Sequence, residues 1–387
     1  MERRPSSKSQ LSRIAVLLLG FSSAAVVTAL LQLNRAEIQA PPTTRISDEE
    51  TANVILLDYE GLLHNTLDSF YAKSDTEQPV ISSRAELLAA LGAPASCPIE
   101  SDGLIASAKL MVEVSQGHIY QVRGHAECDT VRLPWFALVG VPRSAATGTL
   151  LLFHGTASNP EQLFGFEGQD AFPDYTDRAA LKALTDGFVV IVPLILTDSG
   201  RVSEASHNSA RNRIDRRAQA LGFRLLGLEQ VAISHLVGSL IARYSEPDTP
   251  IIAYGISLGG KIAFYQAALS NQIDVVIVSN WIEDRFAKTF DRESPHALWR
   301  YESMDYAILD RRGVFVPDES VAALIYPRGL IVEVGREDPR KESMQSTVAK
   351  ISQIYKRHPN QMSVVVGEGG HQMFYNPAMK LAQQMQR

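Results

Sequence analysis

The sequence is poor in cysteine and carries no surplus of positive charge. Its 387 residues include two cysteines, and neither has the closely spaced Cys or His partners of a zinc site. The formal net charge of −6 gives no electrostatic basis for binding nucleic acid. Internal repeats and low-complexity segments are also lacking, which excludes a repeat array. What is left is an ordinary globular composition, with 45% hydrophobic and 21% charged residues.

Cys97 and Cys128 could form a disulfide in an oxidising compartment, and two free thiols are the alternative. Because the sequence contains no ligand set for a metal ion, we expect no metal. We likewise expect no cofactor, and the sequence leaves the oligomeric state open.

One long uncharged run stands apart at the amino end. It covers residues 14–31 and follows a basic cluster of Arg3, Arg4, Lys8 and Arg13. A run of about eighteen such residues is just long enough to cross a bilayer, and the basic flank keeps the amino end in the cytoplasm. We therefore expect residues 1–40 to anchor the protein in the membrane, with the remainder exported. A cleaved signal segment, which would leave a secreted or periplasmic protein, is the alternative.

The rest of the chain divides by pattern into an extension and one large domain. Residues 41–103 begin as a linker and continue with a mostly helical pattern that matches no known motif. Residues 104–387 alternate between strand and helix patterns, except for residues 282–327, which we interpret as an inserted, lid-like segment. Apolar runs predict strands at residues 108–114, 118–122, 135–141, 149–153, 188–192, 251–254, 273–278, 330–334 and 362–366. Helical spacing predicts a short helix over 179–186 and one long helix over 211–243, in which His235 is a packed residue. Strands this apolar indicate an α/β fold, with a mostly parallel, doubly wound sheet and helices on both faces.

The most informative stretch is Gly255-Ile256-Ser257-Leu258-Gly259, which spells G-x-S-x-G between a strand pattern and a helix pattern. This is the context of a nucleophile elbow, a sharp turn that holds a serine oxygen at the tip of a strand. Gly255 and Gly259 are the small residues that the strained turn needs on either side of Ser257.

A phosphate-binding pattern overlaps this motif, because Gly255, Gly260 and Lys261 fit G-x-x-x-x-G-K. The next residue is Ile262, where such a loop needs Ser or Thr to bind Mg²⁺. The rest of the chain must decide between the two interpretations.

Candidate partners for a serine nucleophile follow two later strands. Functional groups of a parallel sheet gather beyond the carboxyl ends of its strands. Asp338 follows the strand at 330–334, with Glu337 as an adjacent alternative, and His371 follows the strand at 362–366. A histidine can remove the serine proton near neutral pH, and a carboxylate orients the imidazole. The strand-end positions therefore predict a triad of Ser257 and His371 with one of these two acids.

The same chemistry needs donors for the oxygen anion that forms during acyl transfer. The backbone N–H of Leu258 is one candidate, and that of Thr156, in the loop after the strand at 149–153, is the other. His154 and Gly155 are interpreted as structural residues of that turn rather than as a second base.

These motifs together resemble the α/β-hydrolases, and most closely the branch of dienelactone hydrolases and acetyl xylan esterases. The resemblance covers residues 149–375 and rests on His154-Gly155, the Ser257 elbow with Gly260, Gly335 with Asp338, and Gly370-His371. It implies a Ser-Asp-His triad of Ser257, Asp338 and His371. True dienelactone hydrolases have Cys where this chain has Ser257, so the resemblance does not transfer their substrate.

The sequence therefore predicts an exported or membrane-anchored serine hydrolase that cleaves a small ester, as a carboxylesterase does. Two alternatives remain: a peptidase of the prolyl oligopeptidase kind with the same triad, and a non-catalytic binding protein on a hydrolase fold. Trp299, Tyr301 and Tyr306 in the inserted segment could line the substrate pocket or could only pack that segment onto the core.

Overall fold

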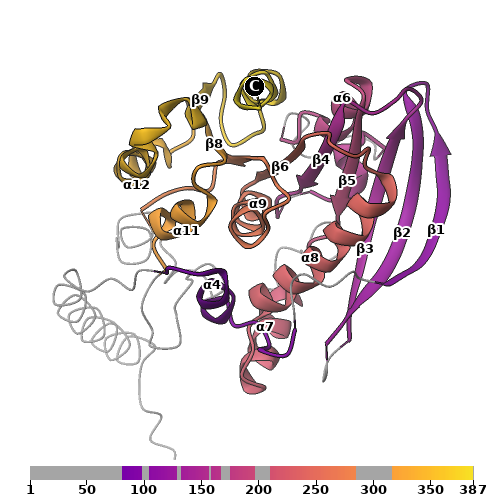
Figure 1. Cartoon of the computed structure of the whole chain (residues 1–387), viewed down its shortest axis with the longest axis horizontal. Helices are drawn as coiled ribbons and strands as arrows, with labels where there is room; N and C mark the ends of the chain where they lie inside the picture. Colours follow the sequence, from indigo (N-terminus) through magenta and orange to yellow (C-terminus); the bar gives the residue numbers. More distant parts are fainter. Residues whose placement is uncertain are drawn as a thin grey trace, which may run out of the picture. The chain divides into compact units, whose positions relative to one another are not determined.

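The computed structural model describes residues 81–97, 104–128, 132–156, 158–166, 175–196, 210–284 and 316–386, all within the compact unit Asp75–Arg387 (Figure 1). The predicted anchor at residues 1–40 lies outside the described residues. So does most of the predicted lid, including Trp299, Tyr301 and Tyr306.

A nine-stranded sheet with the order β1-β2-β3-β5-β4-β6-β7-β8-β9 organises this unit. Strands β1 to β3 pair antiparallel, β3 joins β5 antiparallel, and all pairs from β5 to β9 are parallel. The mostly parallel α/β sheet is therefore confirmed. The strands are β1 Leu104–Glu113, β2 Gly117–Glu127, β3 Arg132–Pro142, β4 Gly148–Phe153, β5 Phe188–Pro193, β6 Ile251–Ile256, β7 Val275–Ser279, β8 Gly329–Gly335 and β9 Met362–Gly367.

The central strands are apolar on both faces, because both faces are covered by helices. Leu151 and Phe153 of β4 belong to one core cluster, whereas Leu150 and Leu152 belong to the cluster on the other face. This alternation follows from the two-residue period of a strand.

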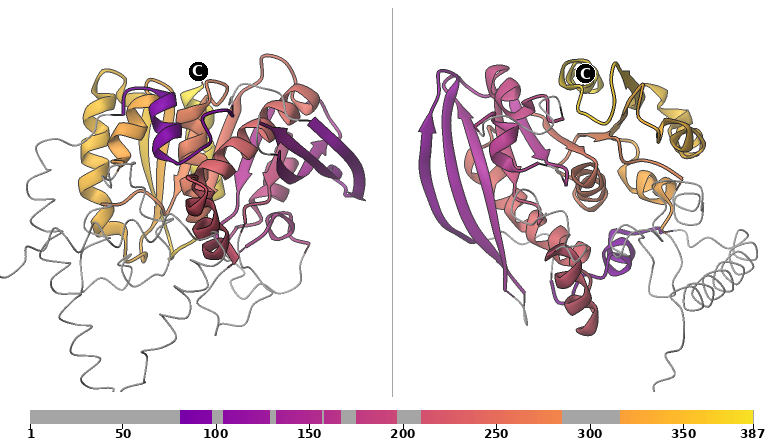
Figure 2. Two further views of the ribbon diagram at one scale, coloured as in Figure 1. Left: turned by 90° about the horizontal axis from the view of Figure 1, so that it is seen from below. Right: turned by 180° about the vertical axis from the view of Figure 1, so that it is seen from behind.

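Helices cover both faces, as the sequence predicts (Figures 1 and 2). Residues of α4, α8, α9, α11 and α12 enter the first cluster, and those of α6 and α13 enter the second. The helices are α4 Arg84–Ala90, α5 Pro160–Leu163, α6 Ala179–Thr185, α7 Ala210–Ala220, α8 Leu225–Tyr244, α9 Leu258–Leu269, α11 Asp318–Ile325, α12 Lys341–Ile354 and α13 Tyr375–Met385, with short 3-10 turns at Tyr355–Arg357 and Pro359–Gln361.

The prediction of a single helix over 211–243 was wrong, because the chain breaks between α7 and α8. Gly222 has a φ of +81°, a left-handed conformation that ends the first helix. The side chain of Asp215 then accepts a hydrogen bond of 2.9 Å from the N–H of Leu225 and so satisfies a free donor where the second helix begins.

Helix α8 is the one helix in the described part of the chain that is long and apolar enough to span a membrane. Its apolar window is 72% buried within the protein, as expected for a core helix. His235 of this helix is buried, which agrees with its interpretation as a packed residue.

Two further features concern the predicted boundaries. Cys97 and Cys128 form a disulfide, so the pairing predicted as one of two possibilities is confirmed. Helix α11 occupies the end of the predicted insertion at 282–327, where it packs against α9, α12 and β8 as a crossover helix of the sheet.

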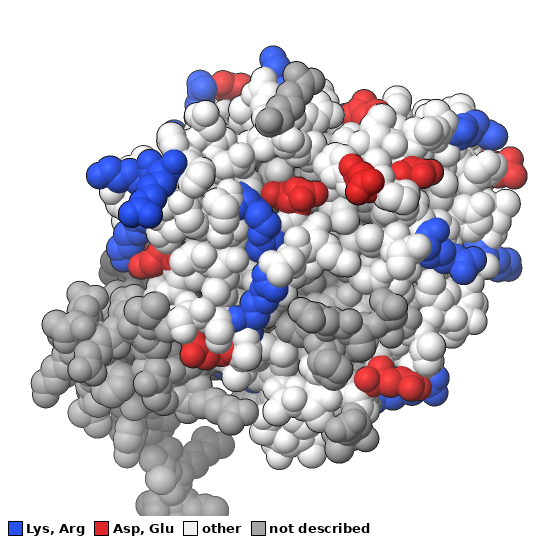
Figure 3. Space-filling view, in the orientation of Figure 1, with Lys and Arg blue, Asp and Glu red and all other residues white. Residues whose placement is uncertain are grey.

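Basic and acidic side chains are interspersed on the face of the molecule seen in Figure 3.

Candidate active site

The turn after β6 has the geometry of a nucleophile elbow. Ser257 has a φ of 55° and a ψ of −118°, a strained conformation for a residue with a side chain. It is partly exposed, whereas its neighbours on both sides are buried. A Cβ atom on Gly255 would lie 2.1 Å from the carbonyl oxygen of Gly259, and one on Gly259 would lie 2.1 Å from that of Phe153. Glycine is therefore required at both positions by close backbone packing.

The alternative phosphate-binding interpretation does not fit this geometry. Gly259, Gly260 and Lys261 all belong to α9, which starts directly after Ser257 and leaves no loop to surround a phosphate. The side chain of Lys261 is fully buried, with its Nζ 5.5 Å from the centre of the Trp281 ring.

The structure brings Asp338 and His371 together. The ring Nδ1 of His371 lies 2.7 Å from Oδ2 of Asp338, whose side chain has no exposed surface. Burial alone raises the pKa of Asp338, but the hydrogen bond from His371 and the charge of Arg340 outweigh it and lower the pKa to about 2. The carboxylate is therefore ionised near neutral pH. The adjacent Glu337 is exposed.

Hydrogen bonds from side chains and backbone join the His371 loop to the elbow. The carbonyl oxygen of Gln372 accepts hydrogen bonds from the Asn280 amide at 2.8 Å and from the Ser279 hydroxyl at 3.3 Å. The carbonyl oxygen of Ser279 in turn accepts a 2.9 Å hydrogen bond from the N–H of Ser257. The ends of β6, β7 and β9 thus hold Ser257 and His371 in one contiguous group of loops.

The loop after β4 packs against the same elbow, since Gly259 closely approaches the backbone of Phe153 and His154. His154 is fully buried, and burial lowers its pKa to about 4. Its Nε2 accepts a hydrogen bond from the N–H of Ile195 at 2.9 Å, so Nδ1 carries the proton and donates to the carbonyl of Gly155 at 3.0 Å. These bonds are compatible with the interpretation of His154 as a structural turn residue. Thr156 follows this turn and is exposed.

Two residues near the site carry no signal in the sequence motifs. Arg340 contacts both Asp338 and His371, and the ring of Tyr175 lies 5.8 Å from that of His371, centre to centre. The Tyr175 hydroxyl would also lie 1.9 Å from a Cβ atom on Gly155. Tyr175 precedes α6 in a stretch without helical or strand periodicity, so only the tertiary structure reveals its position.

A buried acidic group lies beneath the site. Glu333 of β8 is fully buried and accepts hydrogen bonds from the hydroxyl of Tyr254, 2.9 Å from both carboxylate oxygens. It also accepts one from the N–H of Phe374 at 3.2 Å, just after the His371 loop. Burial raises the pKa of Glu333 to about 7, against the opposing effect of these hydrogen bonds.

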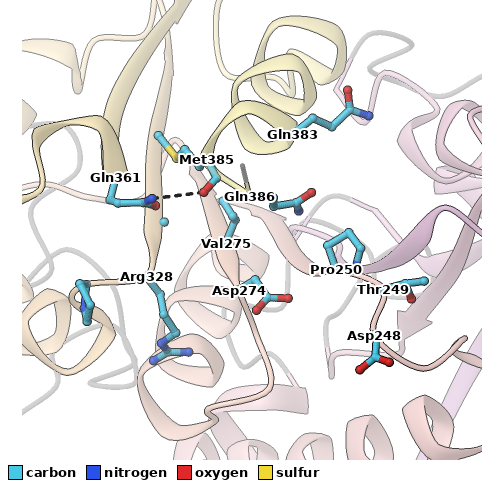
Figure 4. A pocket seen from close by; sticks show the side chains of 12 residues that line it. Asp248, Thr249, Pro250, Asp274, Val275, Arg328, Gln361, Gln383, Met385 and Gln386 are labelled. Carbon is cyan, nitrogen blue, oxygen red and sulfur yellow. Dashed lines mark hydrogen bonds between the residues drawn. The ribbon is translucent and has the colours of Figure 1, made fainter.

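A separate pocket of about 810 Å³, drawn in Figure 4, opens at the amino ends of β6, β7 and β8. Ser257 and His371 instead follow the carboxyl ends of β6 and β9. Two of the pocket's charged residues have structural bonds. Arg328 donates to carbonyl groups that include Ser270 and Ala267, and Asp274 accepts from the N–H of Ile251. Within the described residues, no group of three or more His, Cys, Asp or Glu could hold a metal ion.

No protein-family model and no curated protein matches this sequence. Solved structures do match. A glucuronoyl esterase from Solibacter usitatus has a TM-score of 0.54 at 13% identity, over 79% of this chain and 92% of that chain. Acetyl Xylan Esterase 1 from Thermoanaerobacterium sp. JW/SL YS485 has a TM-score of 0.50 at 17% identity, over 78% and 91% of the two chains. The strand order, the elbow after β6 and this similarity together show that the chain has the α/β-hydrolase fold.

Proposed function

We propose that this protein is a serine hydrolase that cleaves carboxylic esters with Ser257 as nucleophile, His371 as base and Asp338 as the acid that orients it. The observation that carries the proposal is the partly buried Asp338–His371 hydrogen bond of 2.7 Å, whose His371 loop is tied by hydrogen bonds to the strained Ser257 turn. A pair of this kind at the strand ends of an α/β-hydrolase fold suits acyl transfer.

In this mechanism the hydroxyl oxygen of Ser257 attacks the ester carbonyl carbon while Nε2 of His371 takes the hydroxyl proton. The resulting oxygen anion is stabilised by the backbone N–H groups of Leu258 and Thr156, each worth about 3 kcal/mol of barrier. His371 then gives its proton to the departing alcohol, which leaves an acyl group on Ser257. Water, deprotonated by His371, releases the acid and restores the serine.

Esters of carbohydrates are the first substrates to test, because the similar structures include an acetyl xylan esterase and a glucuronoyl esterase. A panel of acyl esters of increasing length, with acetylated sugars, methyl glucuronate and peptide amides, would define the preference. Cleavage of peptide amides alone would favour a peptidase instead.

The variant Ser257→Ala tests the proposal directly. It should fold normally, lose labelling by a fluorophosphonate probe, and retain less than about one thousandth of wild-type p-nitrophenyl acetate hydrolysis. The matched control is Ser352→Ala on α12, an exposed serine whose hydroxyl contacts the carbonyl of Val348 in its own helix and the sulfur of Met362 in β9. Labelling of Ser257→Ala, or no labelling of the wild type, would reject the nucleophile.

We also propose that residues 1–40 anchor the protein in the membrane and that the catalytic unit lies outside the cytoplasm. The Cys97–Cys128 disulfide supports this location, because disulfides persist mainly in oxidising compartments.

A further inference from the structure

Arg340 lies against the predicted base and its acid. Its Nη2 is 2.7 Å from Nδ1 and 3.2 Å from Nε2 of His371, and its Nε is 3.2 Å from Oδ1 of Asp338. The backbone N–H of Arg340 donates to the same Oδ1 at 2.9 Å. The start of α12 fixes this backbone, since the N–H of Met344 and the hydroxyl of Ser343 both donate to the carbonyl of Arg340.

The protonation state of His371 determines whether its contact with Arg340 is favourable or repulsive. Because Nδ1–H donates to Asp338, the neutral ring carries its lone pair on Nε2. The Arg340 guanidinium lies beside both ring nitrogens, and of the two only Nε2 can accept a hydrogen bond from it, which is compatible with a neutral imidazole. Protonation of Nε2 would instead place two cations in contact, which costs free energy in a partly buried site.

We propose that Arg340 is a positioning residue that keeps His371 neutral and Asp338 ionised in the resting site. His371 therefore remains available as a base at lower pH values than it would without the cation. The catalytic consequence of this inference rests on the proposed function. The electrostatic contact between Arg340 and His371 does not, because it can be measured without turnover.

Among the described residues, titratable or charged groups that lie against the ring are Asp338 and Arg340, from the segment between β8 and α12, and Tyr175, from the segment before α6. Asp338 favours the protonated ring and Arg340 disfavours it. Removal of the cation leaves the carboxylate unopposed, so His371 should bind its proton more tightly.

The test uses the full-length chain and diethyl pyrocarbonate, which reacts with neutral imidazole. The rate of modification of His371 is followed by peptide mass spectrometry across pH, and its midpoint reports protonation of the ring. In Arg340→Gln the midpoint should rise by about one pH unit, whereas Arg340→Lys, which retains the charge, should keep most of the wild-type value. The charge-matched control is Arg336→Gln, whose side chain pairs with the exposed Glu368 at 2.7 Å and should leave the midpoint unchanged.

The acid limb of the kcat/KM profile for ester hydrolysis should move in Arg340→Gln by the same amount and in the same direction. An unchanged or lower midpoint in Arg340→Gln would overturn the inference. So would an equal shift in Arg336→Gln, or a shift in Arg340→Lys as large as that in Arg340→Gln. If the wild-type protein does not hydrolyse esters, the proposed function is rejected but the inference about Arg340 is not. The modification of His371 still reports on the contact with Arg340.

Discussion

Two adjacent carboxylates, Glu337 and Asp338, have opposite surroundings at the residue scale. The side chain of Asp338 is enclosed between His371 and Arg340, whereas Glu337 is exposed. The backbone N–H of Glu337 donates to the carbonyl of Gly369 at 2.9 Å, so its role in the loop is carried by the main chain. A change of charge should therefore matter at one position and not at the other.

Replacement of Asp338 by Asn should lower kcat for ester hydrolysis by up to about ten-thousandfold, because an amide favours the wrong tautomer of His371. Steady-state kinetics on p-nitrophenyl acetate measures this loss. The neighbouring change Glu337→Gln is the matched control and should alter kcat less than about tenfold, equivalent to roughly 1.4 kcal/mol. A larger loss in Glu337→Gln than in Asp338→Asn would move the acid to Glu337.

At the scale of elements, β8 contributes a buried acidic side chain in addition to the loop that carries Asp338. Its Glu333 joins Tyr254 of β6 to the chain just before α13, through bonds to the Tyr254 hydroxyl and the Phe374 N–H. A carboxyl group buried between strands disfavours its own ionisation. The hydrogen bonds that join β6, β8 and the chain before α13 therefore depend on the protonation state of Glu333, and so on pH.

The free energy of unfolding should fall as pH rises from about 4.5 to about 7, because the unfolded carboxyl of Glu333 ionises first while the folded one stays protonated. Below this window both states are protonated and the penalty is absent. Above it the penalty from this group is on the order of 3 kcal/mol. In Glu333→Gln, which is neutral at every pH, denaturant unfolding should show a smaller decline across the window.

The control for this measurement is Glu368→Gln, since Glu368 is exposed and pairs with Arg336 on the surface. It should retain the wild-type dependence on pH. A decline in Glu333→Gln as steep as in the wild type would show that another group is responsible.

At the scale of the whole molecule, the cellular compartment decides whether the Cys97–Cys128 disulfide forms and persists. The disulfide joins the segment before β1 to the end of β2, two parts of the chain 31 residues apart. If the catalytic unit is exported, this bond can form and persist. If it stays in the cytoplasm, reduction should leave two thiols.

A reporter enzyme that is active only after export, fused behind Arg387, should be active in the full-length chain. Deletion of residues 1–40 should abolish that activity, because the deletion removes the predicted anchor. Mass mapping without reduction should find Cys97 linked to Cys128 in protein purified from the exported fraction. Reporter activity that survives the deletion, or two free thiols in the exported protein, would contradict the proposed location.

Local sequence determined the parts of this protein that depend on near neighbours. The G-x-S-x-G turn, the apolar strands and the positions of Asp338 and His371 after their strands follow from residue spacing, and the fold agrees with them. The helix break at Gly222 was missed because apolar residues at helical spacing, Leu221, Leu225 and Leu228, continue across it, and a single glycine does not by itself show a left-handed backbone.

Only the tertiary structure decided which side chains meet around His371. Tyr175 reaches that ring from nearly two hundred residues away in the sequence, about half the length of the chain. Arg340 contacts it from the segment after β8, and Glu333 of β8 accepts a hydrogen bond from the N–H of Phe374, three residues after His371. Such contacts depend on strand order and on the direction of each loop at the sheet edge, which spacing along the chain does not specify. The sequence thus determined the chemistry available at each strand end, and packing of the sheet determined the electrostatic surroundings in which that chemistry operates.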